Sequence, residues 1–228
     1  MNLTHKTVVA MLLVLALVGC SSTNRPATEK ETNSIHRSMV IPNEEGSLSS
    51  MTFICSESKK AYTKLFSTLT VGDVSSLWND VCVLNDKYPG IRHLEIFINS
   101  PGGDAFSGLA LADQIQRAQR KGFSVTAHAS GIVASAAVPV FAVCNERLAA
   151  PGTIFMVHET SIWKWPGRET ASDIRSQNKL MEILRKQYLN ILVAHSKLTF
   201  DNWAGMENKT TWFSAEKAKE YGLVDRVE

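Results

Sequence analysis

The residues of this chain best suited to chemistry are a serine in a glycine-punctuated turn and a histidine after an apolar run. Ser135 lies between an alternating run over 123–129, which predicts a strand, and small apolar residues over 136–144, which predict a buried helix. A turn at this point can lift the serine hydroxyl clear of the backbone and set it beside unpaired N–H groups. The alternative is that Ser135 only caps the helix, a role in which serine is common.

Two other stretches favour a catalytic interpretation. A strand over 94–98 runs into Asn-Ser-Pro-Gly-Gly at 99–103, where two glycines let the backbone approach a ligand closely. Another apolar strand, over 153–158, ends in His158. Imidazole titrates near neutral pH, so His158 can take the proton of Ser135 and later return it. Because adjacent parallel strands end at one edge of a sheet, we expect serine, glycine turn and histidine to lie together.

Four motifs, in matching order and with similar spacing, resemble the proteolytic subunit of the Clp protease. They are Asn-Ser-Pro-Gly-Gly at 99–103, Gly-x-x-x-Ser-Ala at 131–136, Met-Val-His at 156–158 and Trp-Phe-Ser-Ala-Glu-Lys-Ala-Lys-Glu-Tyr-Gly-Leu-Val-Asp at 212–225. The resemblance covers residues 90–228. It implies an α/β fold of the ClpP/crotonase-like kind, with repeated βαβ units, a mainly parallel sheet covered by helices and a long projecting helix.

The periodicity of the chain agrees with such an α/β fold. The predicted elements are strand 51–56, helix 74–84, strand 94–98, helix 107–120, strand 123–129, helix 136–144 and strand 153–158. A long helix with an apolar stripe follows the capping box Thr-Ala-Ser-Asp at 170–173. In the Clp-like family the corresponding helix packs two rings of subunits together, so the resemblance implies a homo-oligomer. A helix packed on its own domain would show the same stripe.

The resemblance also assigns the remaining members of a serine peptidase site. Gly103 and Ala136 match the two backbone donors of the family's oxyanion hole, which holds the developing negative charge. The family's third catalytic residue is an aspartate four residues before the serine of the C-terminal motif. Here that position is Thr210, which could accept the histidine N–H without supplying a charge.

Other residues near this position could orient His158 in place of an aspartate. The amide of Asn208 ranks with Thr210, and the carboxylates of Glu207 and Asp201 rank below both. Loss of the orienting carboxylate costs about 10⁴ in rate in a well-studied serine protease triad. We therefore expect reduced activity.

Composition and the absence of certain motifs exclude several classes of partner and cofactor. The 228 residues carry a formal charge of only +2 and no basic run, so nucleic acid is not an expected partner. The chain has no Gly-x-x-x-x-Gly-Lys-Ser/Thr motif, no zinc-type cysteine spacing and only scattered histidines, so we expect no ATP, cofactor or metal. The expected substrates are peptides or unfolded protein segments, without an ATPase partner.

The N-terminal residues indicate export and lipid attachment. Lys6 precedes an apolar run over 8–18, which is short for a bilayer span and typical of a secretory signal. The run ends in Leu-Val-Gly-Cys, which resembles the lipobox of bacterial lipoproteins and implies cleavage before Cys20 and lipid on it. Ser21 favours transfer to the outer membrane. An ordinary signal peptide or anchor with an incidental cysteine is the alternative.

Three regions follow from these patterns. We expect a lipoprotein signal peptide over 1–19, a flexible polar tether over 20–50 and a ClpP/crotonase-like domain over 51–228. The protein would then be lipid-anchored in the bacterial cell envelope and face the periplasm. In that oxidising space, the remaining cysteines predict a disulfide between Cys55 and Cys82, with Cys144 buried and reduced.

Three functions compete on these grounds. The leading one is a serine peptidase, a hydrolase acting through Ser135 and His158. A related membrane-peptidase family uses a Ser–Lys pair on the same fold, but the Met-Val-His match favours histidine. The second function is a catalytically weak or inactive scaffold or binding module, suggested by Thr210. The third is an esterase or thioesterase that uses the same two residues.

Overall fold

The computed structural model describes residues 46–161 and 169–228, and the fold is that of these residues. The predicted signal peptide over 1–19 and residues 20–45 of the predicted tether lie outside them. Packing begins before residue 51, because Leu48 is buried in the core and Ser49 hydrogen-bonds to the buried carboxylate of Asp80. Residues 48 and 49, at the end of the predicted tether, therefore pack against the domain.

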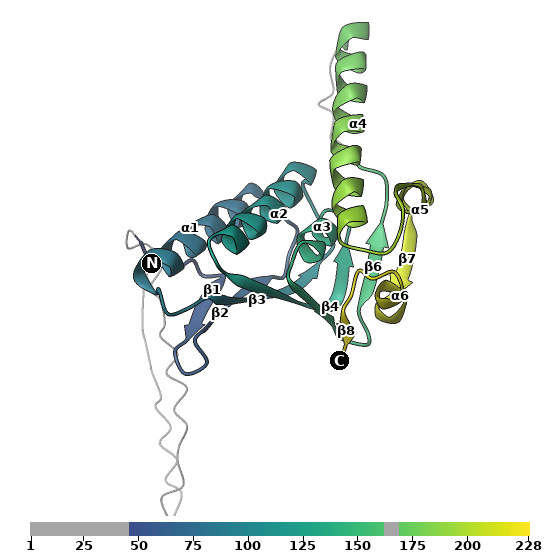
Figure 1. Ribbon diagram of the computed structural model, residues 1–228. Coiled ribbons are helices and arrows are strands. Elements are labelled where there is room, and N and C mark those ends of the chain that lie inside the picture. The colour runs from purple at the N-terminus through teal and green to yellow at the C-terminus, as the bar shows by residue number, and fades with distance from the viewer. Residues whose placement is uncertain (1–45, 162–168) are drawn as a thin grey trace, which may run out of the picture. The chain divides into compact units, whose positions relative to one another are not determined.

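A mixed sheet forms the centre of the described domain (Figure 1). Its strands are β1 Thr52–Cys55, β2 Lys60–Leu65, β3 His93–Ser100, β4 Ser124–Ala134, β5 Glu146–Ala149, β6 Ile154–Val157, β7 Thr211–Ser214 and β8 Arg226–Val227. They lie in the order β1-β2-β3-β4-β5-β8, and β6 pairs with both β4 and β7. Only β1–β2 and β6–β7 are antiparallel among these pairings.

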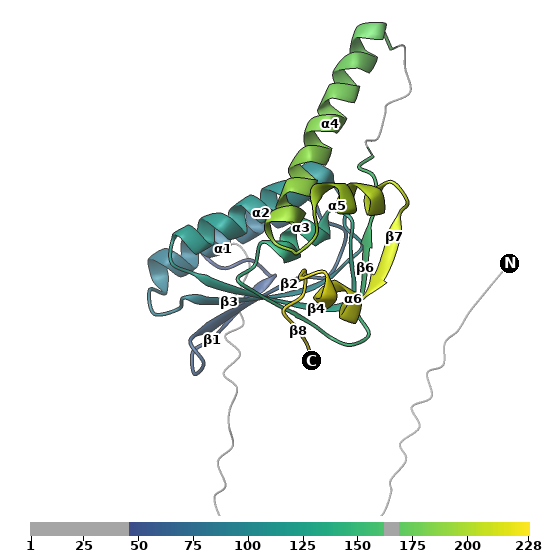
Figure 2. The ribbon, with the colours of Figure 1, turned by 45° about the vertical axis from the view of Figure 1, so that its right-hand side comes forward.

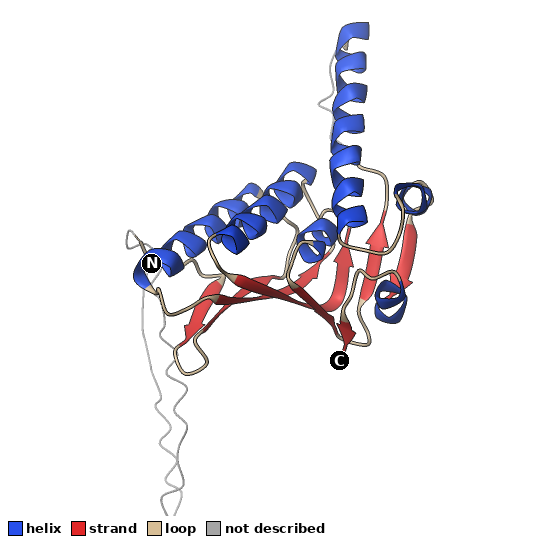
Figure 3. Cartoon of the chain, viewed as in Figure 1, coloured by secondary structure: helices blue, strands red, loops and turns tan. Residues whose placement is uncertain are grey.

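The helices of the described residues are α1 Val71–Lys87, α2 Ala105–Arg120, α3 Ala137–Ala142, α4 Ala171–Ala194, α5 Phe200–Glu207 and α6 Ala215–Glu220. Figure 3 shows α1, α2 and α3 on one face of the sheet. Helix α2 turns Leu111, Ile115 and Ala118 toward the core at helical spacing, against alternate buried residues of β4. This repeated strand–helix–strand arrangement confirms the predicted α/β fold.

Helix α4 leaves this helical layer and projects beyond it (Figure 2). Its buried residues, Leu184, Tyr188, Leu189 and Leu192, all lie in its second half. In contrast, Ile174 and Ile183 are 44% and 48% exposed. The long projecting helix is thus present, and its base packs against the domain. No helix within the described ranges is long and apolar enough to cross a membrane.

The predicted disulfide is wrong, because Cys55, Cys82 and Cys144 are all free thiols. Side chains alternate along a strand, and Thr52 of β1 faces α1, where its hydroxyl donates to Asp80. Cys55, three residues on, therefore points to the opposite face of the sheet from α1, which carries Cys82. Cys144 is buried as expected, and burial raises the pKa of its thiol to about 12.

Candidate active site

Ser135 follows directly on β4 with an unusual backbone conformation. Its φ is +53°, in the left-handed region that costs a non-glycine residue about 1–3 kcal/mol. Hydrogen bonds hold it there: its N–H donates to the carbonyl of Met156 in β6 at 2.8 Å, and its carbonyl accepts from the Val138 N–H at 3.0 Å. The strained turn is fixed by the neighbouring strand and by the first residues of α3.

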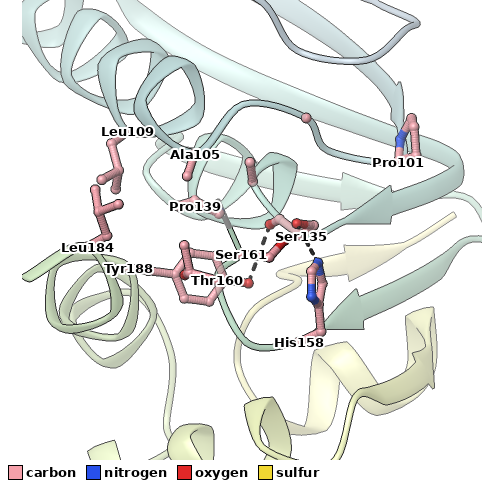
Figure 4. A pocket seen from close by; sticks show the side chains of 12 residues that line it. Pro101, Ala105, Leu109, Ser135, Pro139, His158, Thr160, Ser161, Leu184 and Tyr188 are labelled. Atoms are coloured by element: carbon pink, nitrogen blue, oxygen red, sulfur yellow. Dashed lines mark hydrogen bonds between the residues drawn. The ribbon is translucent and has the colours of Figure 1, made fainter. Parts of the chain in front are cut away.

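His158 follows β6 in the same way and reaches the serine. The parallel register of β4 and β6 pairs Ala134 with Met156, so the residues just beyond both strands meet. His158 Nε2 lies 2.8 Å from Ser135 Oγ, as the dashed line in Figure 4 shows. The structure therefore brings together the two residues that the sequence singles out, in a geometry suited to proton transfer from the hydroxyl.

The glycine turn after β3 packs directly against the serine. A Cβ atom on Gly102, whose φ is +94°, would lie 2.7 Å from Ser135 Cβ and from the Ala134 carbonyl oxygen. A Cβ on Gly103 would overlap the backbone of Leu69. Leu69 in turn fixes the turn, because its N–H donates to the Gly102 carbonyl at 2.8 Å. Only glycines allow this close approach.

Two backbone N–H groups beside the serine are free to bind an anion. Gly103 and Ala136 line one cavity together with Ser135 and His158. Within residues 46–161 and 169–228, neither N–H donates to a backbone or side-chain acceptor. These are the two positions that the resemblance predicts for an oxyanion hole, and the structure places both of them at the serine.

The cavity has a volume of about 260 Å³ and extends from the serine toward the base of α4 (Figure 4). Its apolar wall comes from three helices, and its polar side from the segment after His158. The side chains are Leu109 of α2, Pro139 of α3, Leu184 and Tyr188 of α4, and Thr160 and Ser161. The size and the mixed lining suit one side chain of a peptide.

Thr210, predicted at the position of the third catalytic residue, lies near the histidine without bonding to it. It stands just before β7, exposed and with a φ of +48°. Among the described residues, the imidazole of His158 makes one hydrogen bond, to Ser135. The structure therefore does not bring Thr210 Oγ1 into contact with the ring.

The alternative orienting residues are engaged elsewhere. The amide oxygen of Asn208 accepts from Arg185 of α4 at 3.4 Å. The carboxylate of Glu207 is fully buried and lies 2.6 Å from Arg185 Nε. Asp201 is exposed in the first turn of α5, at the opposite end of that helix from Glu207. None of these three side chains hydrogen-bonds to His158 in the described structure.

The charge of Glu207 affects Tyr188 in the cavity wall. Burial raises the pKa of the Glu207 carboxyl, and the adjacent Arg185 guanidinium opposes that shift. Burial, together with the negative charge of Glu207, also raises the pKa of the Tyr188 phenol. Tyr188 is therefore a neutral hydroxyl that can donate a hydrogen bond. Among the described residues, no group of three or more histidine, cysteine or acidic side chains could hold a metal.

Sequence reasoning missed most of the cavity wall. Tyr188 and Leu184 fall on the apolar stripe of α4, and the sequence gives no sign that they face the serine. Pro139 and Leu109 have the pattern of ordinary interior residues of helices. One feature of the sequence could have pointed to Tyr188: it places a hydroxyl on the otherwise apolar face of the helix. A buried tyrosine usually needs a hydrogen-bond partner for that hydroxyl.

Comparison with known proteins identifies the family of this chain. The model of the Clp protease family matches residues 59–228. The ATP-dependent Clp protease proteolytic subunit of Bacteroides fragilis is 30% identical over 155 residues, which cover 67% of this chain and 72% of the relative. Proteolytic subunit 1 of Salinibacter ruber is 34% identical over 137 residues, covering 59% of this chain and 56% of the relative.

A solved structure shows the same fold. A ClpP1 mutant from Listeria monocytogenes superposes with a TM-score of 0.62 at 19% sequence identity, covering 73% of this chain and 90% of that one. The family match extends over about three quarters of the chain, and Ser135, the glycine turn and His158 lie within the matched range. The chain belongs to the Clp protease family and has the serine peptidase fold of that family.

Proposed function

We propose that this protein is a serine peptidase that cleaves peptides or unfolded segments, with Ser135 as nucleophile and His158 as general base. The observation that carries the proposal is the distance of 2.8 Å between His158 Nε2 and Ser135 Oγ. A serine hydroxyl is a weak nucleophile at neutral pH, and a base within hydrogen-bond reach activates it.

In the first step, His158 takes the hydroxyl proton while Ser135 Oγ attacks the peptide carbonyl. The resulting oxyanion lies between the free N–H groups of Gly103 and Ala136, each of which is worth about 10²–10³ in rate in comparable sites. His158 then gives the proton to the leaving amine, and the acyl group stays on Ser135. In the second step, His158 takes a proton from water, the hydroxide attacks the ester, and the proton returns to Ser135.

Among the described residues, no carboxylate hydrogen-bonds to His158, which lowers the expected rate. Without such a partner, neither the productive tautomer nor the imidazolium is stabilised, and a complete protease triad that loses its carboxylate slows by about 10⁴. This feature favours one second candidate, a Clp-type fold that acts as a scaffold or binding module. An oligomer that binds peptides without cleaving them would support that candidate.

Clp proteases act on peptide substrates as homo-oligomers, and we extend this assembly to the present chain. The exposed Ile174 on the projecting half of α4 supports the proposal, since a second subunit would cover it. Ile174→Glu should lower the mass measured by sedimentation equilibrium. Ser176→Glu makes the same charge change on the exposed polar side of α4 and should leave the mass unchanged. Equal masses for both variants would contradict this assembly.

The location in the envelope rests on the sequence around Cys20, outside the described residues. Lipid on Cys20 would anchor the protein on the periplasmic side, in the outer membrane, where ATP is absent. The named relatives are ATP-dependent, whereas we expect this chain to act on peptides without an ATPase. Cys20→Ser should move the protein from the membrane to the soluble fraction, and Cys55→Ser should not. Membrane retention of the Cys20→Ser protein would contradict the lipid anchor.

Peptide hydrolysis tests the proposed activity. Purified protein without residues 1–19 should cleave members of a fluorogenic peptide library with no ATP added. Ser135→Ala and His158→Ala should each abolish that cleavage while leaving the far-UV circular dichroism unchanged. Cleavage that survives Ser135→Ala would overturn the proposal, and cleavage that survives His158→Ala would overturn the assigned base.

A further inference from the structure

Tyr188 contacts the backbone carbonyl of Ser135 and not its side chain. It lies in the buried half of α4 with its ring in the cavity wall, and its phenol hydroxyl donates to the Ser135 carbonyl oxygen at 3.3 Å. Figure 4 draws this bond beside the one between Ser135 and His158. The side chain therefore contacts the nucleophile's peptide group and leaves the hydroxyl of Ser135 free to react.

That carbonyl belongs to the same peptide group as the N–H of Ala136. The oxygen accepts two hydrogen bonds, from the Tyr188 hydroxyl and from the Val138 N–H. At the other end of the peptide, the Ala136 N–H has no acceptor within the described residues, and Ala136 lines the cavity. The orientation of this one peptide plane thus decides where the Ala136 donor points.

Two physical effects follow from the tyrosine contact. A hydrogen bond to the carbonyl polarises the amide and strengthens its N–H as a donor, by about 10–30% per bond in chains of hydrogen bonds. It also resists rotation of a peptide that follows a residue with a φ of +53°. Both effects favour a donor that is already in place when the oxyanion forms.

Tyr188 can donate its proton to the Ser135 carbonyl because it does not share that proton with the nearby carboxyl of Glu207. The buried carboxylate of Glu207 pairs with the Arg185 guanidinium at 2.6 Å, and the Tyr188 hydroxyl donates to Ser135 instead. Burial and the charge of Glu207 both raise the pKa of the Tyr188 phenol. The hydroxyl therefore stays protonated and directed at Ser135.

We propose that Tyr188 is a positioning residue that holds the Ser135–Ala136 peptide so that the Ala136 N–H points at the oxyanion. This inference rests on the proposed peptidase function and adds a residue that takes no direct part in bond breaking. It predicts that the phenol oxygen matters for the rate of the chemical step, and that the ring alone suffices for packing and substrate binding.

The test compares Tyr188→Phe with a matched control. Tyr221→Phe removes the same atom from a tyrosine that packs on Trp203 and Phe213, outside the cavity. In peptide hydrolysis, Tyr188→Phe should lower kcat by about threefold to tenfold, the usual worth of one neutral hydrogen bond, and leave KM within about twofold. Tyr221→Phe should change neither constant. An unchanged kcat, or a change in KM alone, would overturn the inference.

A second measurement separates this inference from the proposed function. In protein labelled with ¹⁵N-alanine, the Ala136 amide proton should move upfield in Tyr188→Phe and stay in place in Tyr221→Phe, because the polarising bond is lost only in the first. This shift is expected whether or not the protein cleaves peptides. An unmoved Ala136 signal overturns the role of Tyr188. Absence of cleavage by the wild type together with a moved signal would reject the peptidase function alone.

Discussion

Thr211 pairs with Val157 in the antiparallel β6–β7 ladder, and this register sets Thr210 beside His158 at the end of the two strands. Thr210 adopts a φ of +48°, a conformation that β-branched residues avoid and that aspartate tolerates better. The position that the sequence resemblance assigns to the family's catalytic aspartate thus holds a threonine under backbone strain.

Replacing Thr210 by aspartate should therefore raise activity. The carboxylate would accept a hydrogen bond from the histidine N–H and stabilise the imidazolium. We therefore expect kcat to rise at least about tenfold. This rise is only part of the rate factor of about 10⁴ that the carboxylate contributes in a complete triad. Steady-state kinetics on one peptide substrate measure kcat for this variant and for the wild type. Asn208→Asp makes the same change of charge two residues earlier and should have little effect. Equal gains in both variants would indicate a general charge effect and contradict the assignment of this position.

Gly102→Ala should damage the site through a steric clash. The new Cβ would lie 2.7 Å from Ser135 Cβ and 2.9 Å from the Ala136 nitrogen, and φ is +94°. We expect a loss of about 1–3 kcal/mol in the free energy of unfolding and a fall in kcat/KM of at least about tenfold. Urea denaturation and peptide hydrolysis measure the two effects.

Gly152→Ala is the matched control for that substitution. A Cβ on Gly152 meets nothing within 4 Å, so both its stability and its activity should match the wild type. A Gly102→Ala protein with wild-type kcat/KM would contradict the close packing of the glycine turn against Ser135.

Glu95 should make the free energy of unfolding depend on pH in the acid range. It is 5% exposed and lies 2.5 Å from Lys60 Nζ and 2.7 Å from His128 Nε2. Burial raises the pKa of Glu95, but the hydrogen bonds from Lys60 and His128 outweigh it, and the net shift is below the ordinary 4.5. Because the folded pKa is lowered, the stabilisation is present above pH 4.5 and is lost as the pH falls through the folded value.

Urea denaturation of wild type and Glu95→Gln measures this contribution. The variant should be less stable by about 1–3 kcal/mol at pH 7, and the difference should shrink toward about pH 3. Glu57→Gln alters an exposed carboxylate in the turn between β1 and β2 and should follow the wild type at both pH values. A difference between wild type and Glu95→Gln that is the same at both pH values would contradict this role of Glu95.

The meeting of Ser135 and His158 could be predicted because each residue directly follows an apolar parallel strand, and such strands end at one edge. The disulfide prediction failed because it counted cysteines without placing Cys55 on a face of β1. Strands β5 and β7 are four residues long and alternate poorly, so periodicity does not reveal them.

The orienting residue and the cavity wall depend on contacts between distant segments. The sequence identified Thr210 as the matching position, but whether it reaches His158 depends on the conformation of the turn before β7. The contact between Tyr188 and the Ser135 carbonyl joins residues 53 positions apart. Spacing within a single helix carries no information about such a partner.

Labelling with a fluorophosphonate tests the central claim most directly, because only an activated serine reacts with it. Intact mass spectrometry and peptide mapping of the protein without residues 1–19 should show one adduct, located on Ser135. Labelling should disappear in Ser135→Ala and slow by at least about 10²-fold in His158→Ala, in line with the loss of a general base. Folded protein that gains no adduct, or gains it on another residue, would contradict the assignment of Ser135 as the nucleophile.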